Sequence, residues 1–355
     1  MGASDAVINP DAFRSAGSAQ PLTSPYTTPR EGEYENALRP RELSEFVGQT
    51  RCVDNLRIAL HAAKGRGEPM DHVLLCGPPG LGKTSLARIL AGEFGSTLHA
   101  TSGPALERPR DLIGILTQIQ RGDVLFIDEV HRIPAQVEEY LYTAMEDFSV
   151  DFTLDQGPNA RILPLSIAPF TLVGATTREG LLSGPFRSRF GLLERLEPYP
   201  DADLVRILER AARILDCELA PAAAAVIAAR SRGTPRVANR FLRRVRDLAQ
   251  VQRVARIEPP LTEDALARLG VDKHGLEDLD RRILAALANA RGRPLGLKTI
   301  AAAVGESEDT IEEVYEPHLL RCGFLERTAK GRAITRAGRA AVGERESASG
   351  GLYAD

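Results

Sequence analysis

The eight residues 77–84 restrict the possible folds of this chain more than any other part of its sequence. They run Gly-Pro-Pro-Gly-Leu-Gly-Lys-Thr and fit the phosphate-loop pattern G-x-x-x-x-G-K-[ST] at every fixed position. An apolar run at 72–76 predicts a buried strand before the loop, and the pattern at 85–91 predicts a helix after it. Backbone N–H groups of such a loop can surround a polyphosphate, and the helix N-terminus adds a favourable dipole. A Gly/Pro-rich surface turn is the alternative, but the flanking strand and helix favour a phosphate site.

The loop and a later apolar strand carry side chains suited to phosphate chemistry. Lys83 can place a positive charge on the β- and γ-phosphates of a nucleotide, and the Thr84 hydroxyl can bind Mg²⁺. The apolar run 124–127 ends in Asp128 and Glu129. Because open α/β sheets bind ligands at the carboxyl ends of their strands, we expect Asp128 to serve Mg²⁺ and Glu129 to polarise an attacking water. An exposed acidic pair is the alternative, but its position about one βαβ unit after the loop favours catalysis.

Composition narrows the class of protein. The chain has 355 residues and a formal net charge of −3, so any contact with DNA must come from a local basic patch. Its four cysteines lie far apart without a CxxC pair, which argues against zinc or a disulfide framework and indicates a reducing, cytoplasmic setting. No secretory signal is expected, and the longest apolar run, 219–229, is too short to span a bilayer.

The pattern of apolar residues predicts an α/β fold with further domains. Short apolar runs at 73–76, 124–127 and 170–173 alternate with helical segments, as in a parallel sheet. Helices replace strands after Asp201, and the last segment has the order helix, helix, helix, hairpin of a winged helix-turn-helix. The expected divisions are a flexible tail at 1–33, a large α/β domain at 34–199, a helical lid at 200–271, a winged-helix domain at 272–343 and a tail at 344–355.

Three weaker signals point to the same site. Thr177 follows the third predicted strand and could orient water or the γ-phosphate, Arg187 and Arg189 flank a serine past the sheet, and Arg236 starts a lid helix after a proline. An arginine there could stabilise charge on a transferring phosphoryl group. Surface solvation or an internal salt bridge is equally compatible with these arginines.

Taken together, the motifs resemble those of AAA+ ATPases and, more closely, of the RuvB family, bacterial motors of Holliday-junction branch migration. The resemblance is carried by 77–84, 125–132, 174–178 and 232–240, and it continues into the winged-helix segment at 323–328. It covers about residues 38 to 336. It implies a homohexameric ring around double-stranded DNA, ATP and Mg²⁺ as cofactors, the junction-binding protein RuvA as partner and the resolvase RuvC in a larger complex, with no membrane contact.

The resemblance also implies roles for individual residues. Arg189 would be a finger that reaches into a neighbouring subunit, Arg236 a sensor in the same subunit, and Thr177 the first sensor, where many relatives carry Asn. The residues implied to contact the nucleotide are Leu38, Arg39, Gly80, Gly82, Lys83, Thr84, Ser85, Glu146, Asp147, Phe148, Arg189, Tyr199 and Arg236.

Residues 151–169 occupy the place where this family carries a hairpin that docks on RuvA. The segment has a Gly157-Pro158-Asn159 turn, and Leu163 and Leu165 would be its exposed apolar contacts. The alternative is that both leucines pack on their own domain. Pro164 between them departs from a regular strand.

The winged-helix segment suggests how DNA is bound. Its third helix, 307–321, is acidic, and phosphate repulsion makes base readout by that helix improbable. The basic residues gather on the following hairpin, which suggests a wing that follows phosphates without reading sequence. An ordinary solvated hairpin is the alternative. The candidate DNA contacts are Arg327, Lys330, Arg332 and Arg336.

Three functions fit an ATPase joined to a winged helix. The first is a DNA-translocating ATP hydrolase. The second is an ATP-switched DNA-binding initiator, and the third is a clamp-loader-like assembly factor. The acidic third helix argues against a sequence-specific initiator, and the lack of paired cysteines removes a zinc module that clamp loaders often carry. The extended resemblance favours the motor.

Overall fold

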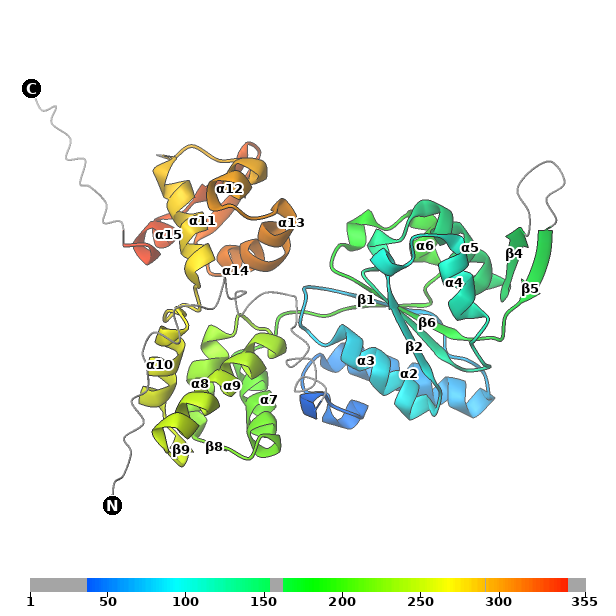
Figure 1. Cartoon of the computed structure of the whole chain (residues 1–355), viewed down its shortest axis with the longest axis horizontal. Coiled ribbons are helices and arrows are strands. Elements are labelled where there is room, and N and C mark those ends of the chain that lie inside the picture. The colour runs from blue at the N-terminus through cyan, green and yellow to red at the C-terminus, as the bar shows by residue number, and fades with distance from the viewer. Residues whose placement is uncertain (1–36, 154–161, 291, 344–355) are drawn as a thin grey trace, which may run out of the picture.

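The computed structural model describes residues 37–153, 162–290 and 292–343. Its centre is a five-stranded parallel sheet with the strand order β2-β3-β6-β1-β7 (Figure 1). The strands are β1 (Val73–Cys76), β2 (Leu98–Ser102), β3 (Val124–Asp128), β6 (Thr171–Thr176) and β7 (Leu192–Arg195). The three strands predicted from apolar runs, β1, β3 and β6, are confirmed and lie at the centre of the sheet. The two edge strands were not predicted, because their side chains are only partly buried and lack a continuous apolar run.

The sheet separates two apolar cores. Val73 and Leu75 of β1 face one core, whereas Leu74 and Cys76 face the other, as the alternation of side chains along a strand requires. The first core contains α2 (Thr50–Arg66) and α3 (Lys83–Phe94) and is continuous with the helical lid. The second contains α4 (Pro109–Leu116), α5 (Ala135–Glu146) and α6 (Gly184–Ser188). The carboxyl ends of β1, β3 and β6 therefore meet at one edge, where the lid approaches.

A two-stranded hairpin projects from the large domain on the side away from the lid (Figure 1). It pairs β4 (Ser149–Thr153) with β5 (Ile162–Ser166), and Pro164 lies opposite Asp151. A two-stranded ribbon has only edges, so Pro164 need not donate a hydrogen bond to a third strand. The predicted turn at 157–159 lies outside the described residues.

The two leucines predicted as exposed contacts of the hairpin differ in how deeply they are buried. Leu163 is 44% exposed. Leu165 instead packs against the second core, beside the buried Ile167. The expected exposure was therefore wrong for Leu165, which is half-buried because it packs on its own domain.

Four helices form the lid. They are α7 (Asp201–Ile214), α8 (Pro221–Arg230), α9 (Pro235–Gln252) and α10 (Pro259–Arg268), with a short parallel pair of β8 (Glu218–Leu219) and β9 (Arg256–Ile257). Proline lies in the first turn of α8, α9 and α10, where its missing N–H costs nothing. Each of these helices therefore begins at its proline.

The last domain has the predicted winged-helix order. It contains α11 (Asp278–Asn289), α12 (Leu297–Val304), α13 (Glu308–Thr310), α14 (Glu316–Arg321), the hairpin of β10 (Leu325–Thr328) and β11 (Gly331–Ile334), and α15 (Arg336–Ala341). The single third helix that we expected is interrupted by a π-helical segment, η6 (Ile311–Tyr315). Pro317 explains the interruption, because it has no N–H and its ring would clash with the carbonyl of Glu313 in a regular helix. In the described part of the chain, no helix is long and apolar enough to cross a membrane.

Candidate nucleotide site

A cavity of about 360 Å³ lies where the edge of the sheet, the N-terminal segment and the lid meet. It brings together twelve of the residues predicted for the nucleotide and its metal ion. They are Leu38, Arg39, Gly80, Gly82, Lys83, Thr84, Ser85, Asp128, Glu129, Thr177, Tyr199 and Arg236. The cavity therefore combines segments that are far apart in the sequence.

The phosphate loop needs glycine at the positions that face its neighbours. Gly80 and Gly82 have φ values of 79° and 107°, which side chains rarely adopt. A Cβ on Gly80 would lie 2.7 Å from Cγ2 of Thr234 in the lid, and one on Gly82 would lie 2.9 Å from the ring of Phe46. Gly82 precedes α3 without a side-chain cap, so the first N–H groups of this 12-residue helix can bind an anion.

Lys83 lies buried at the base of this loop. Its ammonium donates hydrogen bonds to the carbonyls of Gly77 (2.7 Å) and Pro78 (2.9 Å). Burial lowers the pKa of Lys83 to about 8, and the nearby Asp128 acts in the opposite direction. A polyphosphate would give this buried cation an anionic partner, so the site fits a nucleotide.

The two carboxylates at the end of β3 are held differently. The N–H of Glu129 donates to Oδ1 of Asp128 at 3.0 Å, and Glu129 adopts a left-handed backbone with φ of 50°. This turn directs the chain into the short 3₁₀ helix η4 (Val130–Arg132), whose Arg132 donates to Oε2 of Glu129 at 3.0 Å. Both carboxylates line the cavity, so the strand end brings two acidic groups to the same space.

A buried hydroxyl connects this turn to the neighbouring strand. Thr176, at the end of β6, accepts a hydrogen bond from the N–H of Arg178 at 3.0 Å. Its Oγ1 also lies 3.0 Å from Nδ1 of His131 in η4. No role for either residue was predicted from the sequence. Together they fix the position of Thr177, which lies between Thr176 and Arg178.

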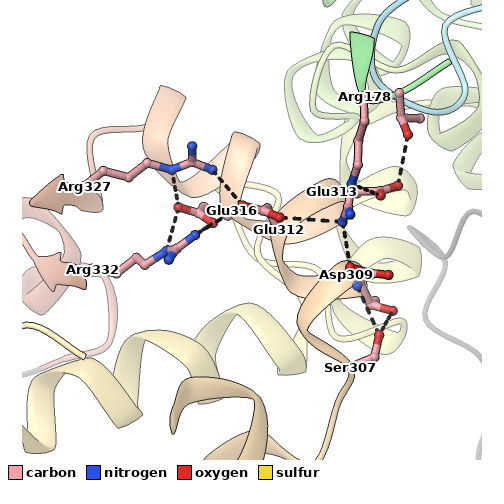
Figure 2. A network of polar contacts seen from close by, with 10 residues as sticks. Arg178, Ser307, Asp309, Glu312, Glu313, Glu316, Arg327 and Arg332 are labelled. Atoms are coloured by element: carbon pink, nitrogen blue, oxygen red, sulfur yellow. Dashed lines mark hydrogen bonds and ion pairs between the residues drawn. The ribbon is translucent and has the colours of Figure 1, made fainter. Parts of the chain in front are cut away.

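Thr177 and Arg178 make contacts that the sequence did not predict. Oγ1 of Thr177 donates to Oε2 of Glu313 in the winged-helix domain at 3.3 Å. Arg178 pairs with Asp309 at 2.7 Å, Glu313 at 2.6 Å and Glu312 at 3.6 Å (Figure 2). The end of β6 is therefore joined to the acidic third helix.

The lid closes the cavity from the opposite side. Arg236 lies in the first turn of α9, and Asn239 follows it by three residues on the same helix and also lines the cavity. The hydroxyl of Tyr199 donates to the carbonyl of Leu81 at 3.2 Å, and burial raises the pKa of this phenol. The helical spacing could have identified Asn239. No sequence motif marks Phe46 or Ile207, which also line the cavity.

Four predicted residues do not line this cavity. Arg189 donates to Oε2 of Glu146 at 3.1 Å and to the carbonyl of Pro185 at 2.7 Å, and it lies over the ring of Tyr142. Asp147 and Phe148 follow Glu146 at the end of α5. The structure thus groups Arg189 with 146–148 on another part of the large domain, away from the cavity of the same chain.

The basic wing is also organised differently from the expectation. Glu316 is buried at 1% exposure and accepts hydrogen bonds from Arg327 (2.6 Å) and from Arg332 (3.1 and 3.0 Å) (Figure 2). Burial acts to raise the pKa of Glu316, but these hydrogen bonds outweigh it and hold the pKa below its ordinary value. The sequence predicts an acidic third helix and wing arginines that contact phosphates. The structure pairs Glu316 of that helix with both Arg327 and Arg332, so these three charges form one cluster. Lys330 and Arg336 are exposed.

The parallel sheet, the phosphate loop at its edge, the helical lid and the paired acidic strand end define a P-loop ATPase of the AAA+ class. Three family models match consecutive parts of the chain. They describe a Holliday junction DNA helicase RuvB P-loop domain at residues 38–196, a RuvB AAA lid domain at 199–272 and a RuvB C-terminal winged helix domain at 273–343. The chain belongs to the RuvB family, which confirms the resemblance and the expected fold class.

Individual relatives agree with this assignment. The Holliday junction branch migration complex subunit RuvB of Chlorobium chlorochromatii is 53% identical over 307 residues, which cover 86% of this chain and 87% of the relative. The RuvB subunit of Acidothermus cellulolyticus is 56% identical over 304 residues, covering 85% and 83%. The solved structure of the Thermotoga maritima RuvB Holliday junction branch migration motor superposes with a TM-score of 0.79 at 49% identity, covering 86% of this chain and 98% of that one.

Proposed function

We propose that this chain is an ATP-driven motor that promotes branch migration of Holliday junctions together with RuvA. The observation that carries the proposal is the single cavity in which the phosphate loop, the acidic end of β3, Thr177 and Arg236 meet. Relatives named as subunits of the Holliday junction branch migration complex support the substrate and the partner. A cytoplasmic homohexamer, with RuvC in a larger complex, belongs to the same proposal.

Each residue has a task that its position allows. The N–H groups at the start of α3 and the ammonium of Lys83 would hold the β- and γ-phosphates, and Arg236 would contact the same nucleotide from the lid. Thr84 and Asp128 offer the oxygen ligands that Mg²⁺ prefers, and the ion would neutralise charge on the phosphates when bound. Glu129 would accept a proton from the attacking water, and Arg132 would orient its carboxylate.

The residues outside the cavity would serve a neighbouring subunit. Arg189 and the segment 146–148 share one region of the large domain, so a ring could place them against the nucleotide of the next chain. An arginine supplied in this way stabilises charge on the transferring phosphoryl group. Arg189 would have to leave Glu146 to do so.

DNA and RuvA would meet two other surfaces. The wing residues proposed to contact phosphates are Lys330, Arg336 and the half-exposed Arg327. Arg332 would contribute mainly to the structure of the wing, through its ion pair with Glu316. Leu163 is the apolar residue of the hairpin proposed to contact RuvA. We also propose that the chain divides near 199/200 and 271/272, just before α7 and before the winged helix.

A synthetic four-way junction tests the function. ATP-dependent strand separation by this chain with RuvA is expected, and Lys83→Ala should abolish it. Tight binding to a particular duplex sequence with negligible turnover would instead support an initiator. ATP-dependent loading of a ring-shaped protein onto DNA, without junction activity, would support an assembly factor.

A further inference from the structure

The third helix of the winged-helix domain lies directly against the catalytic edge of the sheet. Glu313 receives a hydrogen bond from Thr177 and an ion pair from Arg178, and Asp309 and Glu312 pair with the same arginine (Figure 2). We call these five residues the sensor contact. A second observation places the same helix beside the phosphate loop, since Pro79 of the loop and Glu313 and Pro317 of the helix line one small cavity of about 60 Å³. The contact therefore joins two domains at the nucleotide site.

The hydroxyl of Thr177 can serve only one acceptor at a time. It carries a single proton, and an ionised carboxylate accepts hydrogen bonds but donates none. The proton of Thr177 is therefore directed to Glu313. A γ-phosphate accepts hydrogen bonds and would need the same proton, so the sensor contact and a hydrogen bond from Thr177 to that phosphate exclude each other.

Electrostatic repulsion also opposes the sensor contact when a nucleotide is bound. Asp309, Glu312 and Glu313 of the third helix lie against the arginine that follows β6, and a nucleoside triphosphate would add negative charge to the adjoining cavity. Like charges at close range repel, most strongly where water is partly excluded. Arg178, only 25% exposed, compensates the carboxylates in the present arrangement. The charge of a bound triphosphate would therefore oppose the sensor contact.

We propose that the sensor contact is an autoinhibitory latch, in which the winged-helix domain withholds Thr177 from the nucleotide until the third helix moves away. This inference rests on the proposed function, because it takes Thr177 to act on ATP. Linkage then requires that ATP binding weaken the contact by the same factor by which the contact weakens ATP binding. The winged-helix domain would thereby regulate the basal ATPase and not only bind DNA.

Glu313→Ala in the full chain tests the latch, with Glu326→Ala as the matched control. Glu326 is an exposed glutamate on β10 of the same domain and makes none of the sensor contacts. We expect Glu313→Ala to raise basal turnover by roughly three- to tenfold, equivalent to ~0.7–1.4 kcal/mol of lost docking free energy at 1.4 kcal/mol per tenfold. Its affinity for a fluorescent ATP analogue should increase, and the control should match the wild type.

Hydrogen exchange provides an independent measurement. In Glu129→Gln, which should bind ATP without hydrolysing it, addition of ATP and Mg²⁺ should increase exchange across 308–316. Unchanged exchange there, or unchanged or reduced turnover in Glu313→Ala, would overturn the latch while leaving the motor in place. A wild-type chain that binds no ATP analogue would overturn the proposed function itself and this inference with it.

Discussion

The ion pair between Arg332 and Glu316 makes Arg332→Ala a test of what the wing does. Arg332 supplies two of the three hydrogen bonds to the buried carboxylate, at 3.1 and 3.0 Å, and Arg327 supplies the third at 2.6 Å. The substitution would leave Glu316 charged, buried and paired only with the half-exposed Arg327. Breaking a buried ion pair costs ~3–5 kcal/mol, and with Arg327 in place we expect about half of that, ~2 kcal/mol, from the stability of the winged-helix domain.

The pH dependence of this loss has a defined sign. The folded pKa of Glu316 lies below its ordinary value, so the carboxylate contributes stability above its unfolded pKa and loses that contribution as pH falls through the folded pKa. Arg332→Ala removes part of the depression of the pKa. Unfolded Glu316 titrates alike in wild type and variant, so the difference in unfolding free energy between them depends on the two folded pKa values alone. This difference should be largest near pH 7 and should shrink as pH falls through the folded pKa of the variant and then that of the wild type.

Hydrogen exchange of the amides in β10 and β11 measures the unfolding of this domain within the full chain. Lys330→Ala is the control, because Lys330 is exposed in the turn of the wing. It should leave the exchange unchanged but make the slope of log K against log salt for duplex DNA shallower by ~0.9 per engaged subunit. If Arg332→Ala leaves stability intact at pH 7, or destabilises the domain equally at pH 7 and well below pH 4, the structural role is refuted and a direct phosphate contact becomes the better explanation.

Four further predictions address the nucleotide site and the hairpin. Glu129→Gln should bind ATP but hydrolyse it ~10²–10⁴-fold more slowly, because the amide cannot accept the proton; near-normal turnover would remove Glu129 as the base. Arg189→Ala should lose up to ~10³–10⁵-fold in hydrolysis, and mixed rings with Lys83→Ala should regain some activity, since each chain supplies what the other lacks. Titration of ATP affinity against pH should show weakening above about pH 8, by at most tenfold per unit, because the free ammonium of Lys83 loses its proton there while phosphates would keep it charged. Leu163→Ala should weaken RuvA binding while DNA-stimulated hydrolysis persists, and an unchanged affinity in a direct binding assay would remove Leu163 from that surface.

The sequence by itself determined the elements whose signal is local. The phosphate loop, the apolar strands β1, β3 and β6 and the order of the winged helix all follow from residue type and spacing over a few positions. The grouping of Asp128, Glu129 and Thr177 near Lys83 followed as well, because parallel strands bring their carboxyl ends to one edge.

Only the tertiary structure decided which charges neutralise one another. Arg332 and Glu316 are separated along the chain, as are Arg178 and Glu313. All four are charged residue types that usually lie at the solvated surface. A charge run in a sequence does not reveal whether a partner from another element lies within hydrogen-bond distance, or whether burial makes that partner necessary. Leu165 and Glu146 show the same limit, since a strand that leans on its own domain and an arginine that turns toward α5 are outcomes of packing among distant segments. The spacing of apolar residues indicates which side of a helix or strand is buried. The pairing of charged residues depends on how distant elements and whole domains pack together.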